Sequence, residues 1–266
     1  MAKFQYGKAI TDSFKLIFSN LYVFVPQLLV SIIGLLFLPF YFKLIGFGGK
    51  PDIGFLITNF IWIVFFGIAM IILSLFAYGW TFALIGQIVR KGKADLWKEL
   101  KNAREKGLTF FLISLIVILI LIFFMILLMF LMAIGNAVAA LFAILWIIAI
   151  MVLVLSLLYI VPLIALGDLG TVGIIKSSFK HFKNNKAHTF ALFCILLLFG
   201  IVSTIAMYAI LFSFIGSFSN EALALYMAES PFKYSIASFF SGLPSLIVTL
   251  WSFAFLTLSY KRKKGK

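Results

Sequence analysis

The sequence is poor in the side chains that most enzyme and metal sites require. Its 266 residues include one cysteine and two histidines. Cys194 alone forms neither an internal disulfide nor a thiolate-rich metal site. His181 and His188 are too few for a histidine cage, and no cluster of carboxylates accompanies them. A glycine-rich phosphate loop is also missing. We therefore expect no metal, no cofactor and no catalytic residue.

Charge is scarce as well. Charged residues make up 11% of the chain, apolar residues make up 64%, and the mean hydropathy is +1.20. Soluble domains are about 45–50% apolar and 25% charged. One core in water cannot hide this many apolar groups, so the surplus must face lipid. This composition excludes a soluble globular enzyme.

Six apolar stretches are long enough to cross a membrane, which takes about 20 residues. None has an acidic or basic residue in its central part. The second is too long for a straight span and is expected to tilt. The third and fourth are separated only by residues 133–136, which predict a tight turn between antiparallel helices. The sequence thus predicts an all-α polytopic bundle in a single membrane domain, 1–266, with spans at about 21–42, 55–88, 108–133, 137–166, 189–216 and 234–259.

Lysine and arginine are distributed unevenly between the connecting segments. Three precede the first span, seven lie between spans two and three, four lie between spans four and five, and five follow the sixth, so one side has 19. The other side has only Lys43, Lys50 and Lys233. Basic residues in short loops stay in the cytoplasm. We expect a protein of the cell membrane with both termini in the cytoplasm.

A short polar stretch precedes spans one, three and five, and each has the periodicity of an amphipathic helix. Residues 13–20 and 178–185 are identical at four of eight positions. A third stretch, 94–107, stands in the equivalent place although its sequence differs. The pattern predicts three units, each a short cytoplasmic helix followed by a transmembrane hairpin.

The three short helices carry the predicted contact residues. A helix that is apolar on one side and basic on the other is typical of the headgroup layer. The alternative is that these helices pack under the bundle and that their lysines are simply solvated. The partners we expect are anionic lipid headgroups on the cytoplasmic side or a membrane or cytoplasmic protein, and not nucleic acid. The predicted contacts are Phe14, Lys15, Trp97, Lys176, Phe179, Lys180 and Lys183.

In the segment 161–170 a span ends with a proline, a few apolar residues and Asp168. A helix with a Ser-aromatic-basic run follows at 174–185. The whole stretch resembles the membrane domain attached to some glycerophosphoryl diester phosphodiesterases, and related stand-alone multi-pass proteins. Residues 78–80 and 90–97 are similar to the glycine-containing span end and short basic turn of that group. Its enzymes owe their activity to a separate soluble domain, for which this chain has no room. The resemblance therefore implies a fold and not a hydrolase.

Several polar residues have two interpretations each. Asp168 could bind a cation, but capping the helix that follows is favoured. His181 and His188 could sense protons, but solvated loop histidines are favoured. Gln27 follows Pro26, and a backbone carbonyl that the proline leaves open could accept a hydrogen bond from its amide. Polar side chains of this kind usually form hydrogen bonds between helices.

The function we predict is that of a non-catalytic scaffold, partner subunit or lipid-handling component. Ion-coupled carriers usually have an ionisable residue inside the bundle, and here there is none. Asp95 and Glu99 alternate with Lys98 and Lys101, which indicates a salt-bridged surface and not an acid–base pair. The alternatives are a transport-system component for an apolar or lipid-like substrate and an integral lipid-modifying enzyme.

Overall fold

The computed structural model describes residues 4–45, 53–167, 169–216 and 229–264. These residues are almost all helical, and none of them lies in a β-strand. Six of the helices are long and apolar enough to cross a membrane, which confirms the predicted all-α polytopic bundle. The elements are α1 (Tyr6–Phe18), the 3-10 helix η1 (Leu21–Phe24), α2 (Val25–Ile45), α3 (Ile53–Lys91), α4 (Leu96–Ile134), α5 (Asn136–Leu157), α6 (Ile160–Leu166), α7 (Thr171–Asn184), α8 (Lys186–Ile215) and α10 (Pro231–Lys264).

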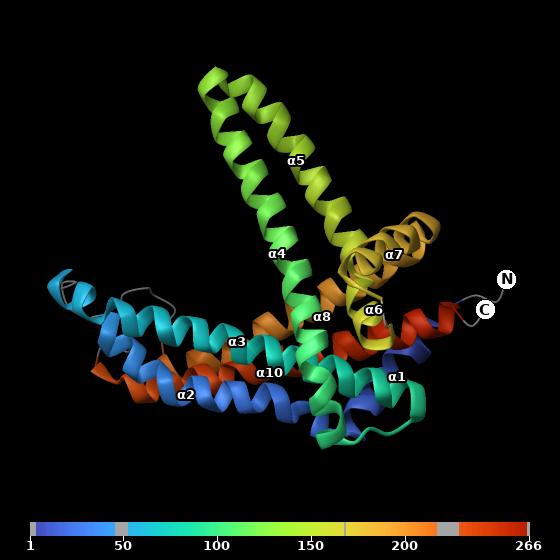
Figure 1. The fold of residues 1–266 in the computed structure, drawn as a ribbon, viewed down its shortest axis with the longest axis horizontal. Coiled ribbons are helices and arrows are strands. Elements are labelled where there is room, and N and C mark those ends of the chain that lie inside the picture. Colours follow the sequence, from blue (N-terminus) through green and yellow to red (C-terminus); the bar gives the residue numbers. More distant parts are fainter. Residues whose placement is uncertain (1–3, 46–52, 168, 217–228, 265–266) are drawn as a thin grey trace.

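The helices form two arms that meet at one end of the molecule (Figure 1). We call α2, α3, α8 and α10 the four-helix arm, and α4 with α5 the hairpin arm. The hairpin arm diverges from the other arm and projects away from it. The end where the arms meet, which we call the base, contains α1, α6, α7 and both ends of the described chain.

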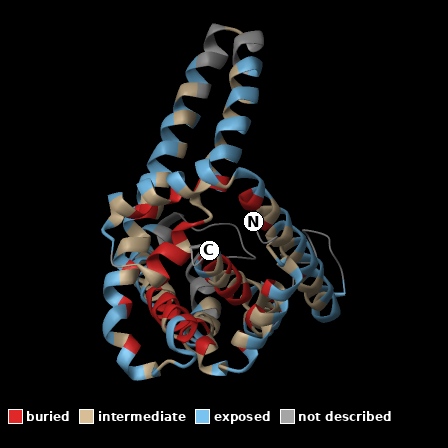
Figure 2. Ribbon diagram, turned by 90° about the vertical axis from the view of Figure 1, so that its right-hand side faces the viewer, coloured by how far each residue is buried: buried red, intermediate tan, exposed pale blue. Residues whose placement is uncertain are grey.

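Buried residues concentrate near the base, and Figure 2, which faces this end, shows them in the body of the molecule and few of them in the hairpin arm. At the centre of one cluster the ring of Trp251 packs 5.1 Å from Phe14, 4.2 Å from Phe199 and 5.1 Å from Phe255. Most residues along the hairpin arm are exposed or half-buried. Exposed isoleucine, leucine and phenylalanine side chains are expected where a helix faces lipid and not water.

Two glycines allow α3 and α4 to cross in backbone contact. A Cβ built on Gly79 of α3 would overlap the carbonyl oxygen of Ala103 and the backbone of Gly107, both in α4. A Cβ on Gly107 would lie 2.6 Å from the carbonyl oxygen of Leu75. Small residues that permit close approach are typical of helix contacts in membranes. This crossing fixes the position of the hairpin arm relative to α3.

Two of the expected helical segments differ from the prediction. Residues 96–107 form no separate short helix, because α4 runs without a break from Leu96 to Ile134. The expected span 137–166 is broken after Leu157, and α6 starts at Ile160. Pro162 has no N–H for the carbonyl of Leu158, which explains the break. The predicted short helices before the first and fifth spans are confirmed as α1 and α7.

Candidate functional site: a basic cavity at the base

The site lies where α3 ends and α4 begins. Gly92 has a φ of 80°, in the left-handed region, and its N–H donates to the carbonyl of Ile88 at 2.7 Å, which ends α3. Three residues later, Oδ1 of Asp95 accepts the N–H groups of Trp97 at 3.0 Å and Lys98 at 3.1 Å. Asp95 therefore caps the start of α4. The short turn holds the two basic helix ends side by side.

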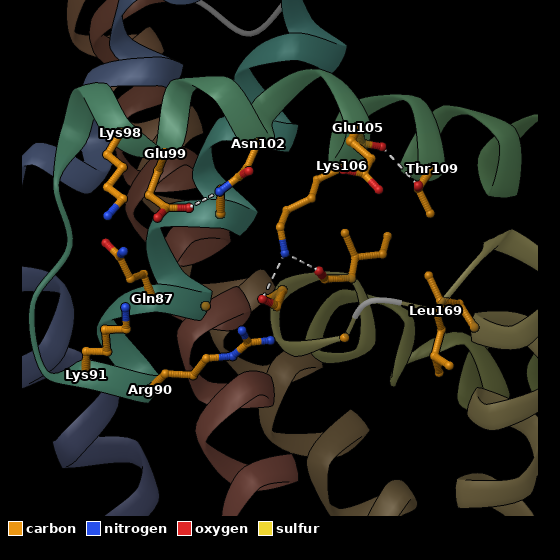
Figure 3. Close-up of a pocket in the computed structure, with 16 residues that line it drawn as sticks. Gln87, Arg90, Lys91, Lys98, Glu99, Asn102, Glu105, Lys106, Thr109 and Leu169 are labelled. Carbon is orange, nitrogen blue, oxygen red and sulfur yellow. Dashed lines mark hydrogen bonds between the residues drawn. The ribbon is translucent and has the colours of Figure 1, made fainter.

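A cavity of about 280 Å³ opens between these helix ends and α6. Four of its lining residues are basic and two are acidic, so the lining has a positive formal charge. Figure 3 shows the side chains around it. We call it the basic cavity, and it is lined by Ala83, Gly86, Gln87, Arg90, Lys91, Lys98, Glu99, Asn102, Glu105, Lys106, Thr109, Ile164, Ala165, Gly167, Leu169 and Ile174.

Two of the four basic side chains hold the end of α6. Nζ of Lys106 donates to the carbonyl oxygens of Ile164 at 2.6 Å and Ala165 at 3.0 Å. The guanidinium of Arg90 donates to the carbonyl oxygen of Leu166. The last carbonyls of a helix have no intrahelical partner and carry a partial negative charge. Arg90 and Lys106 thus have a structural role, because they fasten α6 to α3 and α4.

The other two basic side chains of the cavity, Lys91 and Lys98, do not bind the end of α6. Lys98 from α4 and Lys91 from α3 point toward Gln87 from opposite sides (Figure 3). Oε1 of Gln87 accepts the N–H of Asp95 at 3.0 Å, which fixes the amide. Within the described part of the chain, the ammonium group of neither lysine makes a hydrogen bond or ion pair. Two exposed ammonium groups at one cavity are suited to binding an anion such as a phosphate.

The acidic side of the cavity differs from the surface that the sequence predicts. Glu99 is only 6% exposed, and its Oε2 accepts a hydrogen bond from Asn102 at 2.9 Å. Among the described residues, the one ion pair joins Asp12 to Arg262, far from Glu99 in the chain. The expected salt-bridged surface of Asp95 and Glu99 is therefore wrong: the first residue caps a helix and the second is buried. The described residues contain no group of three metal-binding side chains.

The histidine prediction is also wrong. His188 is 6% exposed and not solvated, and its Nδ1 shares a hydrogen bond with the hydroxyl of Tyr6 at 2.8 Å. His181 is half-buried between the rings of Tyr159 at 5.5 Å and Tyr260 at 4.8 Å. Both histidines pack among aromatic side chains, because α1 places Tyr6 against His188 and α10 places Tyr260 against His181.

The predicted contact residues do not form one patch. The α1 helix packs against α10, while α7 packs against α5 and α6. Phe14 lies in the Trp251 cluster, so its ring belongs to the core. The remaining residues of the predicted set are exposed: Lys15, Trp97, Lys176, Phe179, Lys180 and Lys183.

Two other predicted polar residues have different outcomes. Asp168 lies outside the described residues, between Gly167 and Leu169 of the cavity lining, and its capping role stays a prediction; the residue directly before α7 is Gly170. The amide of Gln27 donates to the hydroxyl of Thr81 on α3 at 3.4 Å, and not to backbone near Pro26. It joins two helices, as such groups usually do.

The sequence does not mark Lys91 or Lys106 as site residues, and its charge pattern places Lys98 on the predicted salt-bridged surface. The detectable pattern was a polar stripe at helical spacing that continues from Lys98 through Asn102 and Glu105 to Thr109. A stripe of that kind on a helix entering a membrane indicates a polar neighbour, which here is the end of α6. No model of a known protein family, no curated protein and no solved structure matches the chain. The resemblance to the phosphodiesterase membrane domain stays a prediction.

Proposed function

We propose that this chain is a non-catalytic, multi-pass component of the cell membrane that handles lipids, with its base and both termini in the cytoplasm. It holds the phosphate of an anionic lipid headgroup in the basic cavity. The observation that carries this proposal is the pair of ammonium groups, Lys91 and Lys98, which face one cavity without a partner in the described chain.

The distribution of charge supports the same function. The segments that we assign to the cytoplasm contain 19 of the 22 basic residues. Each basic residue close to an anionic leaflet contributes about 1 kcal/mol of attraction. The exposed lysines of α7 add to this field. Trp97 and Phe179 are exposed at 72% and 40%, and they supply apolar contact for headgroups or for a protein partner.

The test is a titration of the full chain in mild detergent with glycerol phosphate, which carries a phosphate group on glycerol without acyl chains. The double variant Lys91→Gln/Lys98→Gln removes both ammonium groups. At about fivefold for each charge, its affinity should fall about 25-fold. The variant Lys8→Gln/Lys93→Gln makes the same charge change at exposed positions outside the cavity and should bind normally. Equal affinity in the two double variants would refute the proposal.

A second candidate function is that of a transport component for a lipid-like substrate. The divergence of the hairpin arm (Figure 1) favours it, because an apolar groove lies at the angle between the arms. Proteoliposomes that contain only this protein and a fluorescent phospholipid distinguish the two functions. Transfer of the lipid between leaflets above that of empty vesicles supports transport, and no transfer supports a component that holds lipid in place.

A further inference from the structure

A second cavity lies at the angle between the two arms. It is a groove of about 490 Å³, within the range of about 300–1,000 Å³ that is typical of small-molecule sites. It lies on the side of the glycine crossing where α3 and α4 diverge toward their far ends. We call it the α3–α4 groove, and it is lined by Ile68, Ile71, Ile72, Leu75, Phe76, Arg104, Gly107, Leu108 and Phe111.

This lining is apolar except for Arg104. Arg104 lies one turn before Leu108 on α4, nearer to the base. Residues three or four apart share one face of a helix, so the face that contains Leu108 and Arg104 continues to Lys101 and Trp97. All four side chains are exposed. Toward the base, the groove therefore leads to two cations and a tryptophan, a residue that is enriched where membrane meets water.

The groove and the basic cavity lie on different faces of α4. The cavity uses Lys98, Asn102 and Thr109, while the groove uses Arg104 and Leu108. Helix α4 passes between the two cavities at its crossing with α3. A molecule in the groove therefore cannot reach the cavity lysines without passing around the helix.

We propose that the α3–α4 groove binds one anionic phospholipid of the leaflet nearest the base. An acyl chain lies along the isoleucines of α3 and Leu108, and the phosphate lies at Arg104 and Lys101. The guanidinium recognises a phosphate through paired N–H donors in a fixed geometry. The apolar wall binds the acyl chain through van der Waals contacts along its length.

Charge and position together identify the occupant. A purely apolar partner would leave Arg104 without a counter-charge, and a soluble anion would leave the groove without apolar contact. A phospholipid supplies both chemistries in the order in which the groove presents them. The site shares with the proposed function only the assumption that lipid is the partner, and it does not use Lys91 or Lys98.

The experiment measures lipid retained by the full chain, using native mass spectrometry in mild detergent. Phosphatidylglycerol and phosphatidylcholine with identical acyl chains are the two probes. Arg104→Gln should reduce the phosphatidylglycerol retained in the groove about fivefold and lower the preference over phosphatidylcholine, while Arg104→Lys should keep most of both. Leu108→Trp fills the groove and should reduce retention of both lipids. The matched controls are Lys8→Gln on α1 and Leu198→Trp on α8, both at exposed positions.

Each result has one meaning. A lower preference in Arg104→Gln, with Lys8→Gln unchanged, supports the site. Retention in Arg104→Gln equal to that of Lys8→Gln would overturn it, even where Leu108→Trp fails to fold. The variant Lys91→Gln/Lys98→Gln should keep the preference for phosphatidylglycerol. If that variant loses the preference and Arg104→Gln does not, the lipid lies in the basic cavity, which overturns this inference and leaves the proposed function standing.

Discussion

Replacement of Gly79 by alanine should separate α3 from α4. The added Cβ would overlap the carbonyl oxygen of Ala103 and would lie 2.8 Å from the Cα of Gly107. Ordinary van der Waals contact begins at 3.4 Å, and the atoms in the way are backbone, which no rotamer change can move. Overpacking of this kind costs about 1–3 kcal/mol. For a chain of this size the melting temperature should fall by about 2–12 °C.

The assay is thermal unfolding of the purified protein in detergent, followed by the loss of monodisperse material. Gly67→Ala is the matched control, because Gly67 lies on the same helix and a Cβ there meets nothing within 4 Å. That control should be as stable as the natural protein or slightly more stable, since alanine restricts the unfolded chain. A Gly79→Ala protein that melts with Gly67→Ala would refute the close crossing of the two helices.

Three further predictions concern the base. Lys106→Met removes both hydrogen bonds to the end of α6 and should cost about 1–3 kcal/mol, whereas Lys101→Met, at an exposed position, should leave the melting temperature unchanged. Tyr6→Phe deprives the buried His188 of its hydrogen bond and should also lower stability. Burial raises the pKa of the Tyr6 phenol. The neutral phenol therefore contributes its full stabilisation below the ordinary pKa of about 10, and this stabilisation is lost as pH rises through the raised pKa. The stability of Tyr6→Phe should not show this decrease at alkaline pH. Tags at either terminus should be protected in intact cells and a tag at Glu221 should be labelled from outside, and external labelling of a terminus would reverse the topology.

Much of the fold could be predicted because lipid imposes simple demands on a chain. A span must be long and apolar, so the six spans follow from the hydropathy along the chain, and the turn at Gly135 follows from the length of the apolar run that it divides. The divergence of the hairpin arm could not be predicted, because it depends on where Gly79 meets Gly107. Hydropathy is the same for a glycine that faces lipid and for one that touches a neighbouring helix.

The candidate site was harder to predict than the spans. Lys91, Lys98 and Lys106 all lie beside a span, where a basic residue acts as a topology signal wherever its side chain points. Only the fold separates Lys106, which is bound to α6, from the two lysines that face the cavity. The burial of Glu99 could not be predicted for the same reason, since Lys98 and Lys101 near it in sequence indicate a charged surface while its position on α4 buries it.

The spread of the two arms also has a consequence for the surrounding bilayer. Because both arms start at one base and separate toward their tips (Figure 1), a molecule that lies with its base at one membrane surface, as we propose, displaces less lipid in the leaflet near the base than in the opposite leaflet. A body with this cross-section relieves packing stress where the membrane is convex on the side of the tips. With the base in the cytoplasm, the protein should accumulate in outwardly curved membrane, and a straightened hairpin arm would remove that preference.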